Sequence, residues 1–402
     1  MNIEKRRKMN IEKRLIDYLK KDELTRGGSI VLVGSLIGGA FSYIYQAYMG
    51  RMLGPEEYGI FGAIFAIFYM ISVISQTLSI STTRFVSKFI GEGKQIGFFI
   101  KGSIKQMTII GFVVSVIFLM SNRRLVSILK LSNPWPVFVL ILILFLIWIP
   151  PIIEGGLRGT KRFSVLGLAS VSNAFFKLVF GTFLVALGFG VSGALMGIAF
   201  GILFALMISF IFLRPYIRAN NPHEPDFKFS SFYFYSMPVM LAMIGLSVPS
   251  NIDVVIAKYF LSSTDAGLYT SVSVLGKIIY FFPGAIGIVM FPMIVEKYVK
   301  KENTRTILKQ SLLYTGILSG FLTIIYILSP QLVIKMFGQN YISAIVLVAP
   351  YGITMFLFSI ATIILKYHLA IKDMKYIALF TGFTISEILL LFVFHSSMLE
   401  MI

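Results

Sequence analysis

The sequence predicts an all-α membrane protein with about eleven transmembrane helices arranged in two lobes around a central cavity. Three observations predict it. Of the 402 residues, 57% are hydrophobic and only 13% are charged; apolar segments of about 20 residues recur along the whole chain; and a short motif returns 208 residues later. Soluble domains contain roughly 45–50% apolar and about 25% charged residues. The composition therefore excludes a soluble globular protein.

Eleven segments are long and apolar enough to cross a bilayer core of about 30 Å as helices. Several contain Gly and Pro, which membrane helices tolerate. No polar stretch between them is long enough to form a catalytic domain. The segments lie at about residues 29–50, 58–81, 104–121, 134–153, 165–187, 191–213, 232–257, 267–292, 311–328, 342–365 and 376–398.

The distribution of Lys and Arg predicts the orientation of the chain. With the N-terminus in the cytoplasm, 28 of the 36 basic residues fall in cytoplasmic segments and six in outside loops. Such an excess follows the positive-inside rule. We therefore expect a multi-pass protein of the cell (plasma) membrane with a cytoplasmic N-terminus. The net charge of +18 then indicates orientation, and nucleic acid is not an expected partner.

A repeated motif divides the chain into two halves. Leu53 to Phe61 resembles Leu261 to Tyr269, because a Leu, an acidic turn, a Gly and an aromatic residue recur at a constant offset of 208. Six spans separate the copies, so both halves enter the membrane in the same direction, as in transporters built of two lobes. The predicted parts are a cytoplasmic N-terminus (1–28), an N-lobe of six spans (29–213), a Pro-containing cytoplasmic linker (214–231) and a C-lobe of about five spans (232–402).

Five ionisable residues within or beside the spans are candidates for function, because burying a charge in a bilayer costs about 2.5–3.5 kcal/mol on insertion scales. Lys177 and Lys277, each central in a span, are expected to line a water-filled cavity and meet an anionic substrate; snorkelling or internal pairing is the alternative. Asp253 can pair with Lys277 or bind a cation. Glu387 is a candidate for ion coupling, or a buried protonated carboxyl. Arg84 reaches a phosphate at the inner mouth or anchors its helix to lipid headgroups.

Catalytic and metal chemistry find no support in the sequence. The chain has no cysteine, and His223, His368 and His395 lack the spacing of paired zinc ligands. Paired carboxylates, a nucleophile elbow and a phosphate-binding loop are also missing from the sequence. We therefore expect no enzyme, no catalytic residues, no metal and no cofactor.

Several short motifs, in this order and spacing, resemble the polysaccharide transporter family. This family belongs to the multidrug/oligosaccharidyl-lipid/polysaccharide exporter (MOP) superfamily and includes the O-antigen and lipid-linked oligosaccharide flippases. The resemblance covers about residues 24–394. The motifs are MLGPEEYG at 52–59, EGGLRGTKRF at 154–163, Asn251 to Asp253 followed by Ala266 to Tyr269 and Lys277, and Phe291-Pro292.

The resemblance implies two bundles of six helices around a V-shaped cationic cavity, and translocation of a polyprenyl-linked glycan from the inner to the outer leaflet. It places Lys177, Lys277 and Asp253 approximately at charged positions within the membrane. The implied partners are the glycan substrate and membrane lipids, with glycan-synthesis enzymes as further candidates. Such proteins have at least twelve spans, so a chain that ends after the eleventh is expected to be truncated or completed by a partner.

The function predicted from the sequence is thus a flippase for a lipid-linked oligosaccharide or polysaccharide precursor that works by alternating access. The alternative is a cation-coupled multidrug exporter of the same superfamily. It predicts acidic residues grouped in one lobe, whereas the N-lobe spans contain only Glu154, at the end of a span. A membrane scaffold for a glycan-synthesis complex is a third interpretation.

Overall fold

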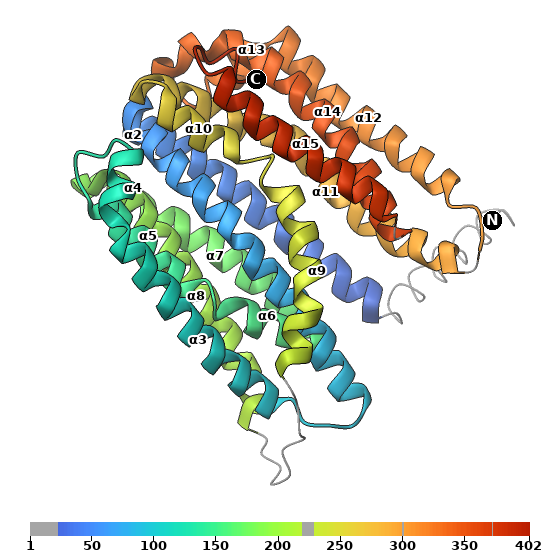
Figure 1. Cartoon of the computed structure of the whole chain (residues 1–402). Coiled ribbons are helices and arrows are strands. Elements are labelled where there is room, and N and C mark those ends of the chain that lie inside the picture. The colour runs from blue at the N-terminus through green and yellow to red at the C-terminus, as the bar shows by residue number, and fades with distance from the viewer. Residues whose placement is uncertain (1–22, 219–228, 300, 372) are drawn as a thin grey trace, which may run out of the picture.

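The structure is a computed structural model that describes residues 23–218, 229–299, 301–371 and 373–402, and their regular elements are helical (Figure 1). In chain order these are α2 (Glu23–Gly91), α3 (Gly97–Met120), α4 (Asn122–Ile128), α5 (Trp135–Leu146), α6 (Pro150–Gly159), α7 (Phe163–Leu184), the π-helical turn η1 (Val185–Phe189), α8 (Gly190–Arg218), α9 (Phe229–Ser247), α10 (Ile252–Phe260), α11 (Ser263–Val299), α12 (Arg305–Leu328), α13 (Pro330–Ile334), the 3-10 turn η2 (Gln339–Ala344), α14 (Ile345–Ala370) and α15 (Met374–Val393).

These helices confirm the predicted all-α, polytopic fold. Within the described residues, six helical stretches are long and apolar enough to cross a membrane. Two of them, Leu36–Gly91 and Phe163–Ile217, are 56 and 55 residues long, so each contains two of the predicted spans. Two shorter apolar helices cover Phe229–Gly245 and Ala378–Val393. The eighth predicted span lies within α11. The protein is therefore a multi-pass membrane protein.

The helices extend beyond the apolar segments that mark them in the sequence. Both ends of the predicted linker 214–231 are helical, because α8 continues to Arg218 and α9 begins at Phe229. A helix needs apolar side chains only where it crosses the bilayer core, so hydropathy underestimates its length. The middle of that linker, 219–228, and most of the predicted N-terminus 1–28 lie outside the described residues.

The repeated motif marks equivalent breaks in the two halves. In α2 the backbone leaves the helical conformation at Gly54, whose φ is 70° and ψ 172°. This left-handed φ suits Gly, and Pro55, which has no N–H, starts the next helical segment. In the second half the chain breaks at Leu261, which is extended, before α11 begins at Ser263. Both turns therefore join one span to the next at the same place in the repeat.

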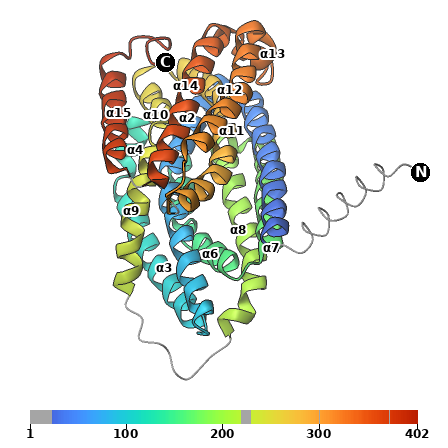
Figure 2. The ribbon, with the colours of Figure 1, turned by 90° about the vertical axis from the view of Figure 1, so that its right-hand side faces the viewer.

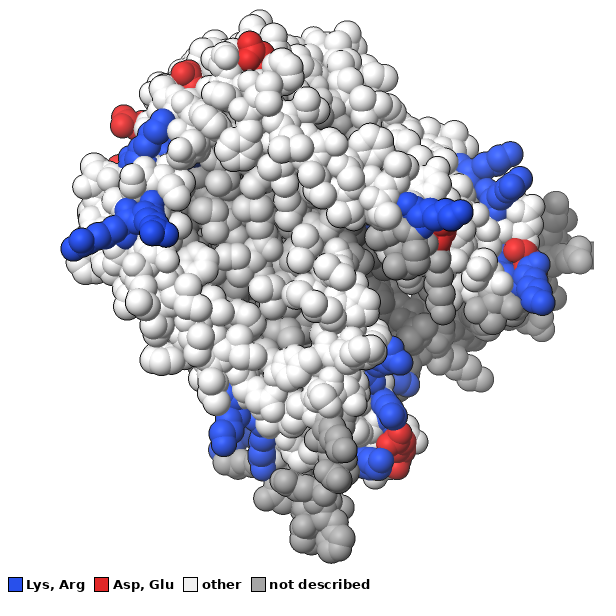
Figure 3. Space-filling model, viewed as in Figure 1, with Lys and Arg blue, Asp and Glu red and all other residues white. Residues whose placement is uncertain are grey.

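The two lobes meet at one end of the molecule and diverge toward the other (Figure 1). We name the diverging end, which holds the connections 92–96, 160–162 and 301–304, the basic end, and the other the opposite end. Lys and Arg dominate the two diverging tips, whereas the opposite end shows both signs of charge, and the surface between the tips is hollowed (Figure 3). Loops predicted to share the cytoplasmic side thus lie at the same end.

Residues related by the repeat hold the lobes together at the opposite end. Gly59 of α2 packs on Gly267 of α11, and a Cβ at Gly59 would lie only 2.7 Å from the Gly267 nitrogen. A Cβ at Gly267 would collide with the carbonyl of Pro55. One turn later Gly62 packs against Thr270 in the same way. Both pairs are separated by the offset of 208, so the pseudo-twofold axis passes between α2 and α11.

Cationic side chains of the N-lobe reinforce this contact. Arg51 donates from Nε to the Met336 carbonyl at 2.8 Å and from Nη2 to that of Lys335 at 3.1 Å. Lys130 donates to the carbonyl of Leu261, which caps the C-terminus of α10, at 3.2 Å. Carbonyls at a helix C-terminus carry partial negative charge and favour cations. The opposite end is therefore closed by backbone contact and by charge-assisted hydrogen bonds.

Toward the basic end, α9 packs on the N-lobe although its sequence belongs to the second half. Ser236 Oγ donates to Ser81 Oγ of α2 at 2.8 Å. The rings of Phe99 and Phe229 stack with centroids 6.0 Å apart, and Phe232 packs edge-on against Phe99 at 5.7 Å. In Figure 1, α9 consequently lies between the two bundles. The divergence of the lobes occurs between α9 and the rest of the C-lobe.

Small residues allow the tightest helix pair of the N-lobe. Two successive GxxxG spacings in α8 include Gly197 and Gly201. A Cβ at Gly197 would lie 2.5 Å from the Gly181 Cα of α7, and one at Gly201 would lie 2.5 Å from the Asn173 carbonyl. In the C-lobe, by contrast, α15 lies at an outer edge of the molecule, on the other side from α7 (Figure 2), and most of its side chains are exposed or half-buried.

We predict that Gly267→Leu separates the lobes at the opposite end. The new side chain would collide with Pro55, and overpacking of this kind costs about 1–3 kcal/mol, which corresponds to roughly a 5- to 150-fold shift in an equilibrium. Glu56→Cys and Thr264→Cys, both exposed beside the crossing, can report the contact through a short thiol cross-linker. Gly316→Leu, where an added Cβ meets nothing within 4 Å, is the control. Undiminished cross-linking in Gly267→Leu would contradict the prediction.

Candidate functional site

The five residues predicted from the sequence fall in three places. Lys177 lies inside the N-lobe on α7, and Arg84 lies between α2 and α9 toward the basic end. Asp253, Lys277 and Glu387 lie in the C-lobe on α10, α11 and α15. The structure thus groups three of the five residues and leaves the other two apart.

The ammonium group of Lys177 is enclosed by α2, α7 and α8. Only 7% of the side chain is exposed, and its Nζ donates to Ser42 Oγ at 2.9 Å. It also lies 5.2 Å from the ring centroid of Tyr45, whose hydroxyl donates to the Ala194 carbonyl at 2.6 Å. An aromatic face attracts a desolvated cation. Gly201 of α8 leaves room for the lysine stem, because a Cβ there would come within 3.1 Å of the Lys177 Cβ.

A cavity of about 310 Å³ adjoins this lysine within the N-lobe. Ser42, which accepts the Lys177 hydrogen bond, forms part of its wall, together with Glu154 and Arg158 of α6. Arg158 also donates to Ser79 Oγ at 3.3 Å. The volume falls at the lower end of the range for small-ligand sites. Ser170, Asn173, Gly38 and Gly39 also line the cavity.

Lys277 lies on the side of α11 that meets α2 at Thr270. It comes seven residues after Thr270, nearly two helical turns, so it shares the face of that residue about 10 Å further along the helix. The side chain is partly exposed, and Nζ donates to Asn251 Oδ1 at 3.0 Å. Asn251 in turn donates to the Ser247 carbonyl at 2.8 Å. A neutral amide therefore holds the ammonium and leaves its charge uncompensated at this contact.

Asp253 is the centre of a buried hydrogen-bond cluster. It lies in the first turn of α10, where the helix dipole favours a negative charge, and 6% of it is exposed. Its Oδ2 accepts from the Tyr351 hydroxyl at 2.7 Å and from the Tyr269 hydroxyl at 3.2 Å. The Tyr351 hydroxyl also lies 2.9 Å from Ser273 Oγ. Asp253 Oδ1 has no hydrogen-bond partner among the described residues.

Two further charged groups come within electrostatic range of Asp253. Glu387 of α15 is half-buried and interacts with it, and so does Lys277. The hydrogen bond of Lys277 goes to Asn251, two residues before Asp253. Buried polar groups in native proteins are normally satisfied, so an orphaned carboxylate oxygen beside a second carboxyl marks a place where a cation or a proton can bind. The cluster joins α10, α11, α14 and α15.

Arg84 is exposed and rests on an aromatic ring of the other half of the chain. Its guanidinium lies 4.0 Å from the centroid of Tyr235 on α9. The ring covers one planar face of the guanidinium, and the N–H groups, which donate in the plane, are left available to an anion. The residue is therefore placed toward the basic end, where the sequence predicted an inner mouth.

The sequence assigned no function to the neutral partners of these charges: Ser42, Asn251, Tyr269 and Tyr351. Asn251 and Tyr269 appeared only as members of short motifs, and no pattern distinguished Ser42 or Tyr351. Tyr269 belongs to the repeated motif, at the position of Phe61 in the first half. Tyr269 carries a hydroxyl that Phe61 lacks, and this difference between the two copies could have identified Tyr269 from the sequence.

The fold of two helical lobes related by a parallel repeat is similar to that of solved membrane transporters. An inward-facing MATE multidrug transporter matches with a TM-score of 0.75 at 15% identity, over 91% of this chain and 92% of that chain. An outward-facing MATE transporter matches with a TM-score of 0.66 at 17% identity, over 95% and 91%. The lipid II flippase MurJ, in an inward closed conformation, matches with a TM-score of 0.71 at 15% identity, over 92% and 83%.

The family follows from the sequence itself. The family described as "Polysaccharide biosynthesis protein" matches residues 24–298. The match covers more than half of the chain, so the chain belongs to this family. The resemblance drawn from the short motifs is thereby confirmed. No curated protein matches the chain.

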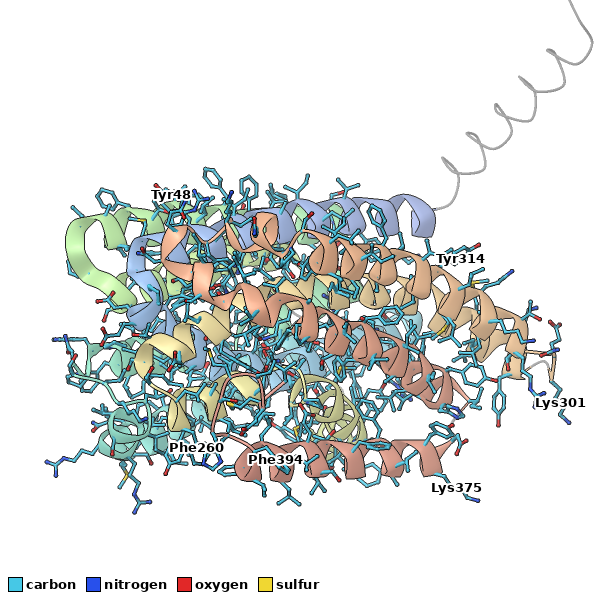
Figure 4. All side chains as sticks on the ribbon, turned by 90° about the horizontal axis from the view of Figure 1, so that it is seen from above. Tyr48, Phe260, Lys301, Tyr314, Lys375 and Phe394 are labelled. Carbon is cyan, nitrogen blue, oxygen red and sulfur yellow. The ribbon has the colours of Figure 1, made fainter. Side chains whose placement is uncertain are left out.

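We predict that Tyr351→Phe destabilises the C-lobe. The substitution removes a hydrogen bond to a buried carboxylate, and hydrogen bonds to charged groups contribute about 1.5–3 kcal/mol. The melting temperature of the purified protein in detergent should therefore fall. Tyr314→Phe is the control, because this tyrosine is 56% exposed at the edge of the bundle on α12 (Figure 4). Equal melting temperatures for the two variants would show that the Asp253 cluster does not stabilise the fold.

Proposed function

We propose that this protein flips a lipid-linked oligosaccharide or polysaccharide precursor from the inner to the outer leaflet of the cell membrane by alternating access. The observation that carries the proposal is a partly exposed Lys277, held by a neutral amide on the interlobe face of α11, in a chain of the polysaccharide biosynthesis family. A cation placed in this way can bind the phosphate of a carrier lipid without first breaking an ion pair.

The route follows from the two ends of the molecule. The opposite end is closed by Gly59 and Gly267, and the surface is hollowed between the tips of the basic end (Figure 3). By the positive-inside rule the basic end is cytoplasmic, and the N-terminus lies on that side. The headgroup then enters from the cytoplasm past Arg84, while the lipid tail stays in the bilayer between the lobes. Separation of the lobes at the opposite end releases it outside.

The membrane potential supports transport in this direction. The substrate's phosphate is anionic, and the cell interior is negative. Moving a negative charge outward gains about 2.3 kcal/mol per charge per 100 mV. Lys177 and Lys277, one in each lobe, compensate that charge during passage. No covalent step is required, because the lobes only change which leaflet the headgroup can reach.

We predict that Lys277→Met and Lys177→Met each slow flipping by about tenfold or more, because hydrogen bonds to charged groups contribute about 1.5–3 kcal/mol. The measurement is translocation of fluorescent lipid-linked oligosaccharide in proteoliposomes. Lys309→Met, at an exposed site of α12, is the control for loss of a charge. Gel filtration separates a folded variant from a misfolded one. Full activity of folded Lys277→Met would refute the cationic site.

We further propose that Asp253 and Glu387 carry ion coupling. The unpaired Oδ1 of Asp253 and the nearby carboxyl of Glu387 support this role. Glu387→Gln keeps the shape of the side chain and removes its charge. We expect it to reduce the dependence of transport on an imposed Na⁺ or H⁺ gradient, with translocation driven by the potential alone retained. If the gradient dependence of Glu387→Gln equals that of the unmodified chain, coupling lies elsewhere.

A cation-coupled multidrug exporter remains the second candidate, and the grouping of Asp253 with Glu387 in one lobe favours it. The two candidates differ in their substrates. Resistance of expressing cells to cationic amphiphilic drugs, together with no translocation of lipid-linked glycan, would select the exporter. Copurification with glycan-synthesis enzymes but no translocation of either substrate would select the scaffold interpretation.

A further inference from the structure

Tyr69 occupies the position in the first half that Lys277 occupies in the second, at the offset of 208 shared by Gly59 with Gly267 and Gly62 with Thr270. Tyr69 lies seven residues after Gly62, and Lys277 lies seven after Thr270. Seven residues are nearly two helical turns, so each side chain projects from the face of its helix that meets the other lobe. The pseudo-twofold axis therefore relates a phenol ring on α2 to an ammonium group on α11.

A series of hydrogen bonds links Lys277 to the backbone of Tyr69. Lys277 donates to Asn251, Asn251 donates to the Ser247 carbonyl, and Ser247 Oγ lies 3.5 Å from the Tyr69 carbonyl. Tyr69 remains 44% exposed at the middle of its helix.

Tyr69 ends a row of aromatic rings along α2. Phe61 and Phe65 stack with centroids 5.5 Å apart, Phe65 and Phe68 stack at 5.9 Å, and Tyr69 meets Phe65 edge-on at 4.7 Å. Neighbouring rings fix the orientation of Tyr69 and supply apolar area beside its hydroxyl. Such a surface fits the C–H face of a sugar ring, with the hydroxyl as a polar handle. It offers no positive charge for a phosphate.

We propose that the cleft holds its substrate in one orientation, with the first sugar on Tyr69 and the adjoining rings of the N-lobe and the phosphate on Lys277 of the C-lobe. This inference rests on the proposed function and names the sugar-binding side of that site. The two halves of the repeat thus divide the recognition of one phosphosugar headgroup. Tyr69 is a specificity residue that contacts the carbohydrate and leaves the phosphate to Lys277.

The test uses two water-soluble probes, citronellyl diphosphate and citronellyl diphosphate carrying N-acetylglucosamine, with the full chain in detergent. Calorimetry gives the dissociation constant of each. Tyr69→Ala should weaken binding of the sugar-bearing probe by about tenfold, as the loss of one aromatic contact implies, and leave that of the bare diphosphate unchanged. Tyr69→Leu should do the same, and Tyr69→Phe should retain most of the affinity. Lys277→Met should weaken both probes equally.

Tyr48→Ala is the matched control, because Tyr48 is 45% exposed and lies at the outer edge of the bundle (Figure 4). The proposal is overturned if the sugar adds no affinity in the unmodified chain, or if folded Tyr69→Ala and Tyr69→Leu weaken both probes alike or neither. In those cases the proposed function stands, because the unmodified chain still binds the bare diphosphate. If the unmodified chain binds neither probe, the proposed function itself fails and the inference fails with it.

Discussion

The close crossing of α2 and α11 at Gly59 and Gly267 is the contact on which the arrangement of the two lobes depends. Lipid tails are as apolar as the helices, so helices in a bilayer associate through close packing and polar contacts. Two glycines let the backbones touch, and the hydrogen bonds of Arg51 and Lys130 lie around that point. Because the crossing is at one end, the lobes diverge toward the other, and this is the region where we propose that Tyr69 and Lys277 bind the headgroup.

The buried charges divide into two kinds according to how they are compensated. Asp253 is held by two tyrosine hydroxyls and a helix dipole, which stabilise its negative charge where it is. Lys177 and Lys277 each donate to one neutral oxygen, from Ser42 and from Asn251. Neutral partners keep a lysine in place at a smaller electrostatic gain than a carboxylate would give. Neither lysine hydrogen-bonds to a carboxylate at these contacts.

Much of the fold was predictable because a bilayer imposes simple rules on sequence. Hydropathy located the spans, and the constant offset between Leu53-to-Phe61 and Leu261-to-Tyr269 identified a parallel repeat. Three features were not predictable. Helix ends outside the bilayer core carry no apolar signal, α9 packs with the half to which it does not belong, and the partners of the charged residues are neutral. Tyr69 could have been found, since the same offset relates it to Lys277.

The position of α9 has a consequence for the affinity of the site. The helix packs on α2, and Asn251, which follows it, binds Lys277 of the C-lobe and donates to the carbonyl of Ser247, the last residue of α9. Any rotation of the C-lobe against α9 must stretch or rebuild that hydrogen bond. In the transport cycle that we propose, the ammonium of Lys277 would then meet a different set of acceptors in each state. High affinity for the substrate on one side of the membrane and low affinity on the other would then follow from the connection between α9 and the C-lobe, without a separate switch.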